Sequence, residues 1–101
     1  MKIILDGMGG DNAPFSVVEG AVLASRETQH HICIIGQEEL IIPDIKKYKY
    51  ESEKISVINA TQVISNDDAP VRAVRSKKDS SIVKGINMVK NGEGDIFISA
   101  G

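Results

Sequence analysis

The chain has 101 residues, and its 12 Lys and Arg against 14 Asp and Glu leave a formal net charge of −2. Hydrophobic residues make up 42% and charged residues 26%, which is typical of a globular domain and excludes a disordered or fibrous chain. The near-neutral charge argues against bulk electrostatic binding of nucleic acid, which relies on many phosphate contacts. We therefore expect one small domain, residues 1–101, in which any anion is held by a local site.

Cysteine usage and the length of the apolar runs indicate a reducing, cytoplasmic setting. Cys33 is the single cysteine, so the chain can form neither an internal disulfide nor a multi-cysteine zinc site. The N-terminal apolar run is too short for a signal peptide, and no later run approaches the roughly 20 residues of a membrane span. We expect a soluble chain with no metal site, in which Cys33 is a small buried hydrophobe.

Four short runs predict strands. Their hydrophobicity is continuous rather than alternating, which is typical of strands covered on both faces. The four runs are Lys2–Asp6, Ile32–Gly36, Ile55–Asn59 and Asp95–Ser99.

Helical patterns lie between these runs. Apolar side chains have helical spacing from Phe15 to Val22 and again from Ile82 to Val89, where Asn91 and Gly92 supply a stop signal. The segment from 37 to 50 is predicted to be a short, broken helix because a proline interrupts it. Strands that alternate with helices imply parallel strands joined by right-handed crossovers. The sequence therefore predicts an α/β fold, a three-layer sandwich around a parallel sheet.

Ligands of such sheets bind beyond the carboxyl ends of the strands, and the first loop there is rich in glycine. The segment Asp6–Pro14 contains three glycines, which allow a tight turn and close approach to a ligand. Asp11 or Asn12 is expected to cap the following helix, with Pro14 in its first turn. The loop is either an anion site or only a tight turn. Nucleotide binding is not favoured, because Asn12 replaces the third glycine of the dinucleotide pattern and no Walker A lysine follows.

The second loop, residues 66–81, is strongly basic. Ser80 or Ser81 is expected to cap the helix that follows, so hydroxyls, amides and lysines can converge there on one anion. The alternative is a solvated basic turn with a serine cap. Asp79 interrupts the run and is expected to orient one of the neighbouring lysines. The cationic residues are Arg72, Arg75, Lys77 and Lys78.

The chain contains an ordered series of motifs: Asp6–Pro14, Asp67–Pro70, Arg75–Ser81, Gly92–Asp95 and Ser99–Gly101. Taken in this order, they resemble the bacterial phosphate acyltransferases, the PlsX family. Gly7 and Gly94 stand where that family usually has alanine, and turns tolerate both changes. The resemblance runs from end to end of the chain and implies the N-terminal part of a longer enzyme with a Rossmann-like, isopropylmalate dehydrogenase-like fold.

The resemblance implies an acyltransferase of phospholipid synthesis. In that family, inorganic phosphate attacks the thioester of acyl-carrier protein and gives acyl phosphate, without a protein nucleophile or a cofactor. It also implies a cytoplasmic homodimer with peripheral membrane attachment, and it implies that residues 1–101 alone are inactive and leave a sheet edge unpaired. The alternatives are a non-catalytic truncated α/β fragment, or a phosphotransacetylase-like enzyme that uses an acyl-coenzyme A.

The same resemblance assigns a phosphate and substrate site to several segments of the chain. Asp6 and Asp11 are expected to orient lysines or turn amides rather than to act as bases, and no catalytic residue is assigned. Arg72 and Arg75 are expected to dock the acidic carrier protein. The expected phosphate and substrate residues are Gly9, Gly10, Asp11, Asn12, Lys78, Ser80, Ser81, Ser99 and Gly101.

Overall fold

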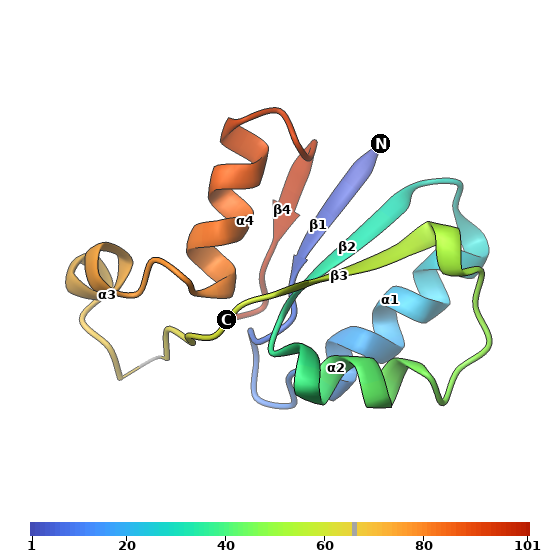
Figure 1. Ribbon diagram of the computed structural model, residues 1–101, viewed down its shortest axis with the longest axis horizontal. Helices are drawn as coiled ribbons and strands as arrows, with labels where there is room; N and C mark the ends of the chain where they lie inside the picture. Colours follow the sequence, from blue (N-terminus) through green and yellow to red (C-terminus); the bar gives the residue numbers. More distant parts are fainter. Residues whose placement is uncertain (66) are drawn as a thin grey trace.

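The computed structural model describes residues 1–65 and 67–101. Its sheet contains four parallel strands in the order β3-β2-β1-β4 (Figure 1). All four predicted strands are present, although the last is shorter than the apolar run that predicted it. The strands are β1 (Lys2–Asp6), β2 (His31–Gly36), β3 (Ile55–Asn59) and β4 (Ile96–Ile98).

Helices cover both faces of this sheet. α1 (Phe15–Glu27) and α2 (Glu38–Ile45) lie on one face, and α4 (Ser81–Lys90) lies on the other (Figure 1). α2 is short, as predicted, but it continues through Pro43 before it ends. A single 3₁₀ turn, Ser52–Lys54, precedes β3. The predicted three-layer α/β sandwich is therefore confirmed.

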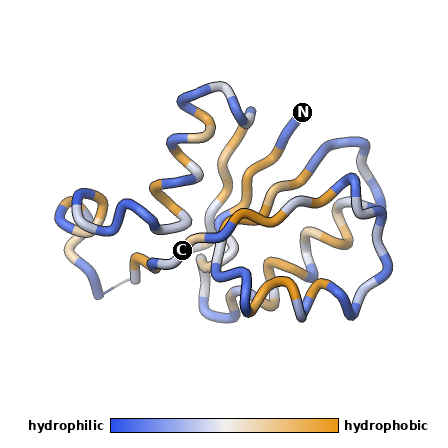
Figure 2. Tube along the Cα trace, viewed as in Figure 1, coloured by the Kyte–Doolittle hydropathy of each residue, from blue (hydrophilic) through white to orange (hydrophobic). Residues whose placement is uncertain are grey.

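Two apolar clusters lie on either side of the sheet. The strands between them are the hydrophobic centre of the molecule in Figure 2. Val22 and Ile34 belong to the cluster between the sheet and α1 and α2. Ile4, Cys33 and Ile35 belong to the other, against which Met88 of α4 packs. Cys33 is fully buried, as predicted, and burial raises the pKa of its thiol.

One helix was not predicted. Residues Pro70–Ser76 form α3, which projects from the sheet (Figure 1), whereas the sequence was interpreted there as a basic loop. Pro70 occupies the first turn, where proline is favoured because no amide donor is needed. α3 lacks the apolar stripe that reveals most helices, because Ala73 is its only buried residue.

The predicted cap of α1 is wrong. The N-cap is Pro14, and no side chain accepts a hydrogen bond at this helix end. Asn12 contributes its backbone carbonyl instead, which accepts from the Ser16 amide at 3.1 Å. At α4 the prediction is confirmed, because Ser80 is the N-cap and its Oγ accepts from the Val83 amide at 3.2 Å.

Lys84 of α4 forms an ion pair with Asp79, which lies just before this helix, and a hydrogen bond with the end of β3. Lys84 Nζ lies 2.7 Å from Asp79 Oδ1 and donates to the Asn59 carbonyl at 2.6 Å. The Asp79 carboxylate also accepts from the amide and hydroxyl of Thr61. The expectation that Asp79 orients Lys77 or Lys78 is therefore wrong, because the first turn of α4 brings Lys84 to the carboxylate.

β4 forms the edge of the described sheet beyond β1. Its Ile96 and Ile98 side chains remain 43% and 49% exposed, so the apolar layer of α1 and α2 does not extend over them. Across residues 1–65 and 67–101, every helix is too short or too polar to cross a bilayer.

Gly85 gives the first test of this packing. A Cβ at this position would overlap the ring of Phe97, which packs under α4. We expect Gly85→Ala to destabilise the fold by about 1–3 kcal/mol through overpacking, although alanine is normally the better helix former. Gly20→Ala in α1 is the matched control, because its Cβ would meet no atom within 4 Å. It should stabilise by about 0.5–1 kcal/mol. Urea unfolding of both variants measures this, and equal stabilisation by both would contradict the packing argument.

Acid unfolding tests the ion pair between Asp79 and Lys84. Hydrogen bonds from Lys84 and then Thr61 hold the pKa of Asp79 well below its usual range. A depressed folded pKa stabilises the fold above the unfolded value, about 3.9, and this stability is lost as the pH falls toward the folded value. Asp79→Asn should therefore make urea midpoints depend less on pH below about 4. Glu93→Gln, an exposed charge change, is the control. An unchanged acid slope in Asp79→Asn would refute the assignment.

Candidate functional site

A cleft of about 280 Å³ opens at the carboxyl end of β1. One side is apolar, formed by Val63, Ile64 and Ile82. The other side is polar and combines the glycine turn after β1 with the segment after β4. The residues that line the polar side are Asp6, Gly9, Gly10, Asp11 and Gly101.

Asp6 joins the segments that build this cleft. Its side chain is 3% exposed, and its carboxylate accepts from the Met8 amide at 3.0 Å. It also accepts from the hydroxyls of Ser81 at 2.5 Å and Ser99 at 2.7 Å. Asp6 thus orients a turn amide, as expected, and its other partners are hydroxyls. Since a buried carboxylate needs such donors, Asp6 ties the end of β1 to the start of α4 and to the segment after β4.

The glycines allow the two loops to interlock. A Cβ on Gly9 would lie 2.7 Å from Asp6 Oδ2 and 2.8 Å from Ser99 Oγ. A Cβ on Gly101 would lie 3.1 Å from the Cα of Gly9. Gly10 has a φ of +97°, which a side chain rarely adopts. Gly9 is therefore required by the approach of the loop after β4, and Gly10 by the turn itself.

The serines of the second loop are already engaged. Ser80 and Ser81 are both buried, the first as the cap of α4 and the second as a donor to Asp6. Their backbone positions mark the start of α4, but neither side chain lines the described part of the cleft. Asn66, with which the second loop begins, lies outside the described residues.

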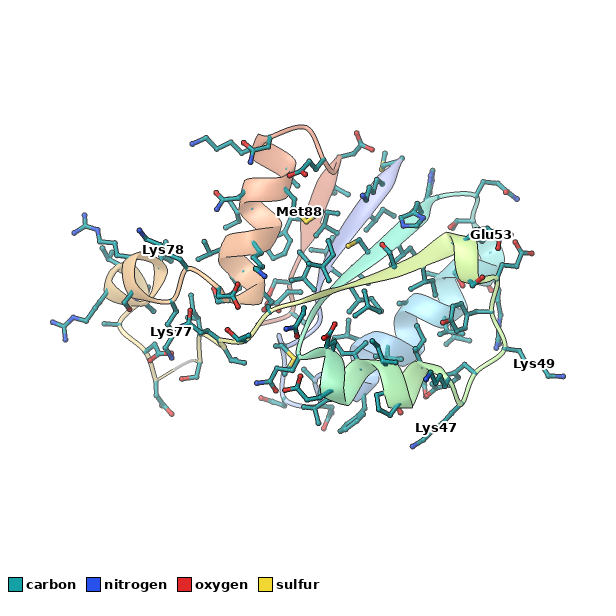
Figure 3. The ribbon with its side chains drawn as sticks, in the orientation of Figure 1. Lys47, Lys49, Glu53, Lys77, Lys78 and Met88 are labelled. Carbon is teal, nitrogen blue, oxygen red and sulfur yellow. The ribbon has the colours of Figure 1, made fainter. Side chains whose placement is uncertain are left out.

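Lys77, whose ammonium group reaches the segment that lines the cleft, is neutralised by a carboxylate. Lys77 lies 2.9 Å from Asp68 and donates to the Val63 carbonyl at 2.9 Å. The hydrogen bond from Lys77 lowers the pKa of Asp68. Lys78 is exposed and, in Figure 3, lies beside α3 together with Lys77, whereas Lys47 and Lys49 lie at the opposite end of the molecule. Because Asp68 already engages Lys77, the lysines of the second loop do not form one cradle for an anion.

The described lining of the cleft consequently carries two carboxylates, Asp6 and Asp11, and includes no Lys or Arg side chain. Of the residues expected at the site, the structure brings together the glycine turn, Asp11 and Gly101, and it connects Ser81 and Ser99 through Asp6. Asn12, Lys78 and Ser80 are not part of this lining. No cluster of three or more His, Cys, Asp or Glu suited to a metal occurs in the part of the chain that the structure describes.

Sequence reasoning did not identify the apolar side of the cleft. Val63 and Ile64 follow β3 in a segment without regular structure, where two apolar residues give no periodic signal. Ile82 was interpreted only as part of the helical stripe of α4. The arginines expected to dock a carrier, Arg72 and Arg75, lie apart from the cleft, along a shallow groove of about 550 Å³ on α3.

Comparisons with known proteins agree with the family resemblance that the motifs indicate. Residues 1–101 match the model of a family described as fatty acid synthesis protein. The chain is 50% identical over 101 residues to a protein named phosphate acyltransferase from Clostridioides difficile (strain 630), and equally so to one from Clostridium kluyveri. It is 48% identical to another from Alkaliphilus oremlandii. All of this chain is covered, but only 30% of each relative. The chain belongs to the fatty acid synthesis protein family.

Proposed function

We propose that the protein containing residues 1–101 is a phosphate acyltransferase that transfers a fatty acyl group from acyl-carrier protein to inorganic phosphate. The observation that carries this proposal is the family match over the whole chain, together with relatives of that name. The cleft at the carboxyl edge of the sheet supports it, because parallel α/β sheets bind their ligands there. The proposal includes a cytoplasmic homodimer with peripheral membrane attachment, as the sequence resemblance implies.

The reaction needs positioning more than it needs a protein nucleophile. A phosphate oxygen attacks the thioester carbonyl carbon, and the tetrahedral oxyanion then collapses as the carbon–sulfur bond breaks. The products are acyl phosphate and the carrier thiolate, which takes up a proton. A thiol with a pKa of about 8.5 is a fair leaving group, so most of the acceleration must come from orientation and from donors to the oxyanion. Cys33 is fully buried in β2 and takes no part.

The two sides of the cleft suit the two reactants. The apolar side, with Val63, Ile64 and Ile82, fits the acyl end of the thioester. The glycine turn offers backbone donors on the polar side. Because the described lining has two carboxylates and no cation, phosphate needs a positive charge from elsewhere. Lys78, exposed on the connection between α3 and α4, is the residue we assign to this role.

The carrier protein is proposed to dock on α3. Arg72 and Arg75 flank a groove that also includes Val71, whose side chain is 67% exposed. Exposed arginines beside an apolar residue suit an acidic protein surface, since charge steers the encounter and apolar contact holds it. Only Ala73 of this helix is buried, so its outer face remains open to a partner.

The proposed activity predicts acyl phosphate formation without added metal. The full-length protein containing residues 1–101 should convert acyl-carrier protein and inorganic phosphate to acyl phosphate and free carrier thiol after exhaustive chelation. The reason is that the proposed reaction relies on amides and cationic side chains for charge stabilisation. Acyl-coenzyme A in the same assay tests the alternative donor. Loss of activity on chelation, restored by a divalent ion, would rule out the metal-free mechanism.

The basic residues should divide their roles. Lys78→Ala should mainly raise the KM for phosphate, by roughly tenfold, because a charged hydrogen bond contributes about 1.5 kcal/mol or more. Arg72→Ala should mainly raise the KM for acyl-carrier protein and weaken its dependence on ionic strength. Lys47→Ala, at the opposite end of the molecule, serves as the control for lost surface charge. Identical kinetic defects in the Lys78 and Arg72 variants would exclude this division.

A further inference from the structure

The partners of Asp6 determine the direction of its hydrogen bonds. An ionised carboxylate only accepts, and each serine hydroxyl has a single proton to donate. Ser81 donates its proton to Oδ1 at 2.5 Å, and Ser99 donates its proton to Oδ2 at 2.7 Å. Met8 donates its backbone N–H to Oδ1 at 3.0 Å. Both serine protons are therefore committed to Asp6.

The hydrogen bonds continue, with the same donor-to-acceptor direction, from Ser99 to Gly101. Ser99 Oγ accepts from the Gly101 amide at 3.2 Å, so one chain of hydrogen bonds runs from the Gly101 N–H through Ser99 to Asp6. Ser99 can offer lone pairs to a ligand, but it has no proton left to donate. An anion in the cleft cannot be bound by this hydroxyl while Asp6 holds its proton.

The backbone of the glycine turn provides the remaining donors. The N–H groups of Gly10 and Asp11 have no acceptor within residues 1–65 and 67–101, and both residues line the cleft. The positive φ of Gly10 sets the local course of this turn. Amides fixed in a turn bind anions without a formal charge of their own.

From this geometry we propose that Asp6 is a positioning residue of the phosphate site. It keeps the hydroxyls of Ser81 and Ser99 turned away from the anion and fixes the two loops, so that phosphate is bound by the amides of Gly10 and Asp11. This inference rests on the proposed function, and it assigns the binding of phosphate to backbone donors instead of to the serines.

Replacement of Asp6 by asparagine reverses one of these bonds. The Met8 amide still requires an oxygen at the Oδ1 position, so the new amide nitrogen lies where Oδ2 was and donates to Ser99. The Ser99 proton is then released toward the cleft. The experiment measures the Kd of inorganic phosphate, by calorimetry on the full-length protein, for Ser99→Ala, Asp6→Asn and the double variant. Asp11→Asn removes the same charge from the same cleft and corrects for electrostatics.

We expect Ser99→Ala alone to change the Kd by less than about twofold, because the hydroxyl donates nothing to phosphate. In the Asp6→Asn background, the same change should weaken binding by roughly fivefold or more, since the released hydroxyl has become a donor. Asp6→Asn should also bind phosphate more tightly than Asp11→Asn does. Weakening by roughly fivefold from Ser99→Ala in both backgrounds would overturn the proposal. If Asp6→Asn does not fold, Ser99→Ala alone is the test. A change in Kd of less than about twofold supports the proposal, and a weakening of roughly fivefold overturns it.

A measurement without ligand separates this inference from the proposed function. If no variant binds phosphate, the phosphate assignment fails, and amide hydrogen exchange then tests Asp6 by itself. Asp6→Ala removes the acceptor of the Met8 amide and the acceptor that orients Ser99, so both the Met8 and the Gly101 amides should exchange faster, whereas Ser99→Ala should affect only the Gly101 amide. Unchanged exchange at both amides in Asp6→Ala would overturn the positioning role.

Discussion

The burial of one carboxylate, that of Asp6, determines how the cleft at the end of β1 is built. Asp6 closes β1 with its side chain 3% exposed, and an ionised group in that position is tolerated only when donors surround it. Its donors come from its own turn, from α4 and from the segment after β4. Three pieces of chain that are distant in sequence are thereby held at one point. The position of the cleft follows from this requirement.

Close packing then restricts which residues can follow Asp6. The loop after β4 passes so near the glycine turn that a Cβ on Gly9 would meet both Asp6 and Ser99. A glycine motif at the carboxyl end of a strand is commonly interpreted as space for a ligand. Here the space beside Gly9 is occupied by Asp6 and Ser99, while Gly10 and Asp11 line the cleft. The same motif thus has a structural part and a part open to the cleft.

Electrostatics separates the basic residues into distinct groups. Lys77 and Lys84 pair with carboxylates and hold the second loop and α4 in place. The arginines lie on α3, away from the cleft. A run of positive charge in the sequence therefore does not become a single positive surface. Buried or paired cations stabilise the local structure, and only the unpaired, exposed ones remain available to a phosphate or an acidic partner.

The sequence alone determined the layers of this fold and the family to which the chain belongs. Continuous apolar runs and helical spacing predicted the parallel sheet and its covering helices, because a strand buried on both faces needs apolar residues at successive positions. The two serines before an apolar helix likewise predicted that Ser80 or Ser81 caps α4, and the cap is Ser80. α3 was missed because it buries only Ala73 and so leaves no periodic signal.

Only the tertiary structure decided which polar groups meet. Asp6 and Ser99 are 93 positions apart, and Asp6 and Ser81 are 75 apart, yet they share hydrogen bonds that no local pattern encodes. The pairing of Asp79 with Lys84 instead of a nearer lysine depends on the path of the chain into α4. Hydrogen bonds act over about 3 Å and depend on direction, so the partner of a side chain follows from the packed backbone. Hydrophobic burial has no such direction, which is why the sequence reveals the layers and only the structure reveals which polar side chains are partners.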